Sequence, residues 1–246
     1  MSQFQDAPAP RPVRYAAASH VGRVRKLNED SILSLPDQRI WVVADGMGGH
    51  AAGDFASQTV TEAVAMLPTD LAPGDKMRAV RGAVLAAHDT IRAEAEARGG
   101  ETIGTTVVAL ILSESHFAAL WAGDSRLYRF RGGDLEMLTT DHSLVAEMVL
   151  AGQMDWDEAE HHPQSNAITR AVGVGEELAL DKVHGAIEPG DRFLLCSDGL
   201  TKYASSTTLR TLVPGAPIET LADRLMQLAL DGGGADNISV IVVDVG

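Results

Sequence analysis

Short runs of apolar residues recur along the chain and predict buried β-strands. The runs are rich in β-branched or aromatic residues and are bounded by glycine or aspartate, as is typical of strands in a packed sheet. Residues 127–138 are expected to form a hairpin that turns at Gly132-Gly133. The other predicted strands cover residues 31–35, 40–44, 105–112, 116–122, 192–196 and 238–245.

Between these strands, apolar residues recur with helical spacing. In residues 76–98 they fall on one face of a helix, and we expect Asp75 to cap its start and Gly99 to end it. Further helices are predicted over residues 51–66, 143–151 and 218–230. Because strands and helices come in groups rather than in strict alternation, the pattern favours an α+β fold with antiparallel sheets and helices packed outside.

The chain of 246 residues is long enough for one large domain, which we expect over residues 14–246. Residues 1–13 are rich in proline and alanine, and we expect them to form a flexible tail. The segment around residues 143–170 is more polar and is expected to be an exposed helical insertion.

Charge and cysteine content narrow the function further. The chain has 34 acidic and 20 basic residues, a net charge of −14. Such a surface repels nucleic-acid phosphates and anionic lipid, so neither is an expected partner. It would also repel a phosphorylated substrate unless bound cations reversed the local field. The lone cysteine, Cys196, allows no internal disulfide and fits a cytoplasmic location. No signal peptide or membrane-spanning run is expected.

Acidic residues stand at the ends of the predicted strands. They are Glu29, Asp30, Asp45, Asp124, Asp198 and Asp236. Any one of them alone fits an ordinary turn residue. That interpretation weakens for Asp45, because the glycine-rich residues 46–53 begin no return strand, and because the pattern recurs. Carboxylates gathered at one rim repel each other, and hard divalent cations can offset the repulsion, so this oxygen-only set favours Mg²⁺ or Mn²⁺.

Six segments together resemble the metal-dependent protein phosphatase (PPM) family, the type 2C serine/threonine phosphatases, in its bacterial branch. They are residues 22–30, 45–50, 123–128, 141–143, 197–200 and 236–239. The resemblance covers nearly everything from residue 19 to residue 245 and rests on the order and separation of the segments. It implies a four-layer α-β-β-α sandwich, with two antiparallel sheets packed face to face and flanking helix pairs.

The resemblance also implies two Mg²⁺ or Mn²⁺ ions and a third, weaker metal site. Asp45 is expected to bridge the two ions, and the Gly46 carbonyl to bind the second. The further expected metal-site residues are Asp198 and Asp236 for the first ion, Glu29 and Asp30 on the other side, and Asp124 with Asp198 for the third. A hydroxide between the two ions would attack the phosphorus of phosphoserine or phosphothreonine in line.

Substrate contacts are implied in the same way. Arg25 stands five residues before Asp30, where the family places its phosphate-binding arginine, and the segment after Ser143 matches a mobile flap. Asn237 either orients Asp236 or the substrate, or caps a strand. Ser143 either contacts the substrate side of the flap, orders the flap, or supplies an outer metal ligand.

The general acid is less directly indicated. Animal members have a histidine two residues after the bridging aspartate, and Met47 stands at that position here. The nearest candidate is His50, for which a loop histidine without a catalytic part is the alternative. His161 and His162, in the polar segment, are interpreted as solvated.

The family implies phosphorylated protein substrates, including those of an opposing serine/threonine kinase, and we expect a monomer. Two other function classes stay open. One is a nucleotide-binding ATPase or histidine-kinase-like module, because residues 45–49 resemble an adenine-binding loop, although no phosphate-cradling Gly-rich Lys-Ser/Thr motif accompanies it. The other is an inactive phosphoprotein-binding adaptor, which the loss of a core metal ligand would mark.

Overall fold

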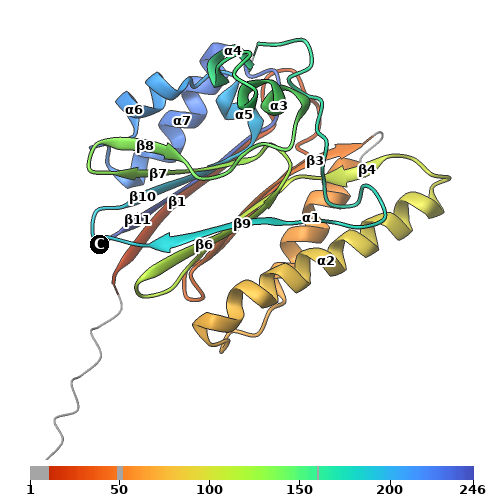
Figure 1. Cartoon of the computed structure of the whole chain (residues 1–246), viewed down its shortest axis with the longest axis horizontal. Helices are drawn as coiled ribbons and strands as arrows, with labels where there is room; N and C mark the ends of the chain where they lie inside the picture. The colour runs from red at the N-terminus through yellow and green to blue at the C-terminus, as the bar shows by residue number, and fades with distance from the viewer. Residues whose placement is uncertain (1–10, 49–51, 160) are drawn as a thin grey trace, which may run out of the picture.

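The chain folds around two stacked β-sheets, as Figure 1 shows for a computed structural model that describes residues 11–48, 52–159 and 161–246. The first sheet has the strand order β1 (Val13–His20), β11 (Ile238–Val245), β10 (Arg192–Cys196), β7 (Arg126–Arg131) and β8 (Asp134–Met137). The second has the order β2 (Asp30–Leu35), β3 (Ile40–Gly48), β5 (Val107–Leu112), β6 (His116–Ala122) and β9 (Asp181–Ala186), with β4 (Ile103–Thr105) paired to β3. The pairings among these described strands are antiparallel.

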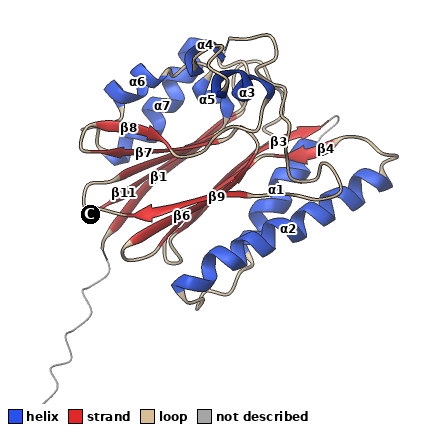
Figure 2. Cartoon of the chain, in the orientation of Figure 1, coloured by secondary structure: helices blue, strands red, loops and turns tan. Residues whose placement is uncertain are grey.

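Helices cover the outer faces of both sheets (Figure 2). Helices α1 (Ala52–Ala65) and α2 (Pro73–Ala97) pack on the second sheet, and α6 (Ser206–Leu212) and α7 (Ile218–Gly232) pack on the first. Three short helices, α3 (Leu144–Leu150), α4 (Trp156–Ala159) and α5 (Asp198–Thr201), lie near one end of the sandwich. The predicted α+β fold, with its α-β-β-α layers, is confirmed.

Strand β3 shows why the central strands are apolar along their whole length. Its residues Ile40 and Val42 pack against the helices of the second sheet, whereas Trp41 and Val43 pack between the sheets. Successive side chains of a strand point to opposite faces, so both faces of β3 are buried. The rigid layer that results holds the strand ends in fixed positions.

Several predicted elements differ in detail. The strand predicted over residues 40–44 continues to Gly48, so Asp45 lies within β3 rather than after it. The strand predicted over residues 105–112 divides at Thr106, because the Asp45 N–H donates to the Thr106 side-chain hydroxyl rather than to a backbone carbonyl of that strand. Helix α2 begins at Pro73 with Ala72 as its N-cap, so Asp75 lies in the first turn rather than capping it. There its carboxylate still favours the positive end of the helix dipole. None of the described helices is long and apolar enough to cross a membrane.

Candidate metal centre

Acidic residues from both sheets meet at one end of the sandwich. Because the strands are antiparallel, the start of β2 lies beside the end of β3, and the end of β10 lies beside the start of β11. A cavity of about 210 Å³ opens at this end. Its lining includes Arg25, Glu29, Asp45, Gly46, Met47, Asp124, Asn166, Ile168, Asp198, Asp236 and Asn237. Glu29 and Asn237, 208 positions apart in the sequence, therefore line one cavity.

Asp45 is held by a rigid backbone. It is the direct cross-strand partner of Asp30, whose side chain is buried behind the cavity. The Asp45 N–H donates to the Thr106 hydroxyl at 3.0 Å, and the Thr106 N–H donates to the Asp45 carbonyl at 2.8 Å. Gly46 allows close packing beside it, because a Cβ there would lie 2.1 Å from the Gly53 carbonyl oxygen. The Asp45 carboxylate is thus presented in a fixed position.

Ser197 joins the two sheets behind the cavity. Its hydroxyl donates to Asp30 Oδ2 at 2.9 Å and accepts from the Ser239 N–H at 3.0 Å. Ser197 is also the residue that precedes Asp198 and α5, so the link fixes where β10 ends. The carboxylates of the first sheet are therefore held in register with those of the second.

Asn237 fixes the loop that leads into β2. Its Oδ1 accepts from the Glu29 N–H at 2.8 Å, and its Nδ2 donates to the carbonyls of Val21 and Leu27, each at 2.9 Å. The side-chain amide is therefore engaged with the segment that carries Arg25 and Glu29. This geometry supports a positioning part for Asn237.

Asp124 lies where the chain passes from β6 in the second sheet to β7 in the first. The preceding residue, Gly123, has φ of 105°, a conformation that favours glycine. His142 makes two hydrogen bonds to Gly123. Its ring Nδ1 accepts from the Gly123 N–H at 3.1 Å, and its backbone N–H donates to the Gly123 carbonyl at 2.9 Å. The buried Asp124 side chain is thereby aimed into the cluster.

The gathered carboxylates resist ionisation. Burial, with Asp30 and Asp198 nearby, raises the pKa of Asp45 well above its usual range. Burial and the nearby Asp198 do the same to the pKa of Asp124. Burial raises the pKa of Asp30 to about 7, despite hydrogen bonds from Ser239 and Ser197 that lower it. Bound cations would offset this repulsion.

Three carboxylate oxygens of the described cluster accept no hydrogen bond. Within the described part of the chain, Asp30 Oδ1, Asp124 Oδ1 and Asp198 Oδ1 are buried and lack a hydrogen bond. Buried carboxylate oxygens are normally satisfied, and hard divalent cations bind such oxygens. The donor set therefore fits Mg²⁺ or Mn²⁺. Among the same residues, however, no three acidic, histidine or cysteine side chains are already grouped to hold a metal ion.

Two side-chain cations occupy part of the cluster. Arg25 Nε lies 2.9 Å from Asp236 Oδ1, and its Nη2 lies 3.0 Å from Asp236 Oδ2. Lys202 Nζ lies 2.8 Å from Asp198 Oδ2 and 3.2 Å from Asp236 Oδ2. Burial alone would raise the pKa of Asp236, but Lys202 and Arg25 outweigh it and lower that pKa. Asp198 and Asp236, both expected to hold the first metal ion, are thus paired with side-chain cations.

Lys202 was missed in the sequence analysis. Burial lowers the pKa of Lys202, but the carboxylates of Asp198 and Asp236 outweigh burial and raise that pKa above its ordinary value. The side chain is therefore charged. Its signal in the sequence is the spacing of four residues from Asp198, which places an acid and a base on one helical face. Asn166 and Ile168, from the polar insertion, also line the cavity and carried no such signal.

Other predicted residues lie elsewhere. Ser143 is buried at the start of α3, where its hydroxyl accepts from the Ala146 N–H at 3.2 Å, so it caps a helix instead of lining the cavity. Asp141, from the segment 141–143 that resembles the family, forms a buried ion pair with Arg126. His50 lies outside the described residues.

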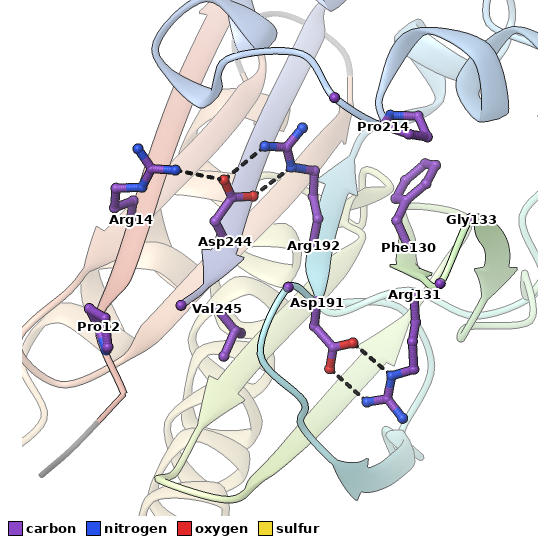
Figure 3. Close-up of a pocket in the computed structure, with 14 residues that line it drawn as sticks. Pro12, Arg14, Phe130, Arg131, Gly133, Asp191, Arg192, Pro214, Asp244 and Val245 are labelled. Carbon is purple, nitrogen blue, oxygen red and sulfur yellow. Dashed lines mark hydrogen bonds and ion pairs between the residues drawn. The ribbon is translucent and has the colours of Figure 1, made fainter.

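A second cavity, of about 490 Å³, lies at the opposite end of β10 and β11 (Figure 3). Its arginines already have acidic partners. Arg192 pairs with both oxygens of Asp244, and Arg131 pairs with both oxygens of Asp191. This cavity is larger, but both of its aspartates are paired with arginines. Among the described residues, the buried carboxylate oxygens without a hydrogen bond belong to the acidic cluster, so the 210 Å³ cavity is the better candidate for chemistry.

Comparisons with known proteins show the family of the chain. The profile of the protein phosphatase 2C family matches residues 18–235. The serine/threonine protein phosphatase PstP of Mycobacterium tuberculosis is 40% identical over 234 residues, which cover 95% of this chain and 45% of PstP. The chain thus spans less than half the length of that relative.

Solved structures are equally similar. PppA, described as a key regulatory component of T6SS in Pseudomonas aeruginosa, has a TM-score of 0.88 and 42% identity, covering 95% of this chain and 98% of that one. The catalytic domain of PstP, in complex with two manganese ions, has a TM-score of 0.86 and 38% identity, with the same coverage. With the family profile matched over most of its length, the chain belongs to the protein phosphatase 2C family.

Proposed function

We propose that this chain hydrolyses phosphoserine and phosphothreonine in proteins with the help of two Mg²⁺ or Mn²⁺ ions. The observation that carries the proposal is the convergence of carboxylates from both sheets on one cavity. In the described part of the chain, three buried carboxylate oxygens in or behind this cavity lack a hydrogen bond. The metal-bound structure of the related PstP domain supports the choice of cations.

Each acidic residue has an assigned part. Asp45 would bridge the two ions, since carboxylates of both sheets lie close enough to raise its pKa. The remaining assignments are the Gly46 carbonyl for the second ion, Asp198 and Asp236 for the first, Glu29 and Asp30 on the far side, and Asp124 for a third ion. When bound, the ions would supply a hydroxide nucleophile near neutral pH and neutralise charge on the phosphoryl group.

Arg25 would bind the phosphate. Its side chain is 51% exposed at the mouth of the cavity, so the guanidinium can exchange Asp236 for a phosphate group. A guanidinium matches two phosphate oxygens and neutralises the charge that develops on them. Asn237 would position Arg25 through the loop that it anchors.

The leaving serine or threonine oxygen requires a proton, and we assign His50 as its donor. The segment of residues 143–170 would act as a flap beside the site, because Asn166 and Ile168 border the cavity. An opposing serine/threonine kinase, a monomeric state and a cytoplasmic location stay predictions from the sequence.

Phosphate release from a phosphothreonine peptide tests the proposal. We expect release with Mn²⁺, none in excess chelator, and recovery when Mn²⁺ is returned. Tight ATP binding without phosphatase activity would instead support the ATPase-like alternative. Phosphopeptide binding without hydrolysis would support the adaptor.

Arg25→Ala should lower kcat/KM for the phosphopeptide by roughly ten- to a hundredfold, because a hydrogen bond to a charged group is worth about 1.5–3 kcal/mol. Arg23→Ala is the matched control. Arg23 is also about half exposed, but it points to α7, where its Nε donates to the Leu230 carbonyl at 2.8 Å. Its loss should cost far less, and equal losses in the two variants would show that Arg25 is not the phosphate ligand.

A further inference from the structure

Lys202 is a cation built into the acidic cluster. It directly follows α5, and its side chain is only 18% exposed. Its ammonium lies between two carboxylates, 2.8 Å from Asp198 Oδ2 and 3.2 Å from Asp236 Oδ2. One lysine therefore joins the end of β10 to the segment that begins β11.

Both carboxylate oxygens of Asp236 are engaged in hydrogen bonds or ion pairs. Its Oδ2 accepts from Lys202 and Arg25, and its Oδ1 contacts Arg25 Nε and accepts from the Asn237 N–H at 2.9 Å. Asp198 differs, because its Oδ1 is buried without a hydrogen bond in the described residues. A divalent cation would thus find one oxygen of Asp198 without a hydrogen bond, whereas both oxygens of Asp236 are engaged with side-chain cations.

We propose that Lys202 substitutes for a divalent cation in the acidic cluster: it stabilises the fold before metal binds and weakens the binding of the metal. The proposal rests on the proposed function in one respect, which is that Asp198 and Asp236 are taken as metal ligands. The ammonium neutralises part of the repulsion between those two carboxylates. It then opposes an incoming cation by charge repulsion and by competition for Asp236 Oδ2.

Lys202 is better suited than Arg25 to substitute for a divalent cation. Arg25 is 51% exposed, so solvent screens its effect on the cluster, and its guanidinium is assigned to the phosphate. Lys202 has a flexible stem and also lines a neighbouring cavity of about 110 Å³, whose lining includes Asp157 of α4. The displaced ammonium therefore has an acidic side chain to move toward when a metal ion takes its place.

Lys202→Met, which keeps the length of the side chain and removes its charge, tests the proposal. Titration calorimetry with MnCl₂ should show at least about tenfold tighter binding than in the unaltered chain, because one nearby positive charge is gone. In chelator, the melting temperature should fall by roughly 5–10 °C, since breaking a buried ion pair leaves its partners uncompensated. Lys182→Met, at an exposed lysine of β9, is the matched control and should change neither quantity.

The outcomes separate this proposal from the function on which it rests. Equal or weaker Mn²⁺ binding by Lys202→Met overturns it, because a lysine that merely orders its ligands would lose affinity when removed. If the unaltered chain binds no Mn²⁺, the metal-dependent function is refuted. If, in addition, Lys202→Met has the same melting temperature in chelator as the unaltered chain, the stabilising role of Lys202 is refuted. If the variant folds only with Mn²⁺ present, the proposal is supported. If Lys202→Met fails to fold even with Mn²⁺ present, a divalent cation does not replace the ammonium and the proposal is wrong.

Discussion

Asp45→Asn should abolish nearly all phosphopeptide turnover while leaving the fold intact. Asparagine has the shape of aspartate but lacks the charge that would hold two cations together. Losing several kcal/mol of charge stabilisation corresponds to a fall in kcat of about a thousandfold or more. The fold should survive, because Thr106 fixes the backbone of this residue through its own N–H and hydroxyl.

The same variant should not lose stability in chelator. Burial and nearby carboxylates raise the pKa of Asp45 in the folded state. The Asp45 carboxyl therefore destabilises the folded state at any pH above the pKa that it has in the unfolded chain. Removing that charge should leave the melting temperature at pH 7 unchanged or higher. Asp134→Asn, at an exposed residue of β8, is the control and should keep full activity. Full activity of Asp45→Asn, or of the unaltered chain in excess chelator, would refute the metal mechanism.

Much of the fold was predictable because its central strands are buried on both faces. Continuous apolar runs such as β10 and β11 stand out from the loops around them. The acidic residues of the site follow from the same feature, since each stands next to such a strand. Antiparallel pairing then brings the end of one strand beside the start of the next, so Asp30 and Asp45 become neighbours.

The elements that were missed have weaker patterns. Strand β9 lies at a sheet edge and is largely exposed, and β1 contains three alanines and few large apolar residues, so neither forms an apolar run. The interruption at Thr106 depends on a hydrogen bond to Asp45, which lies 61 positions away in the sequence. Lys202 was overlooked for a similar reason. Its contact with Asp198 is local, but its contact with Asp236 arises only from the packing of α5 beside β11.

Asp124→Ala should keep the two principal metal ions and still lose most turnover on phosphopeptides. Asp124 borders both the cavity at Asp45 and a smaller one that extends toward α3 and α4. It comes from the crossing between β6 and β7, whereas the other acidic residues come from the paired strand ends. A cation bound there would share Asp198 and lie on the flap side of the site, beside the substrate.

The measurement for Asp124→Ala combines calorimetry with kinetics. Two Mn²⁺ ions should still bind with nearly unchanged affinity, while kcat for a phosphothreonine peptide falls by about a hundredfold, the loss expected when one cation no longer stabilises the transition state. Stability should not suffer, because burial and Asp198 raise the pKa of Asp124 and its charge is unfavourable in the folded state. Asp124→Asn, which keeps the side-chain shape, should show the same separation of binding from turnover. Loss of all metal binding in either variant would place Asp124 among the ligands of the principal pair and contradict the assignment of a third site.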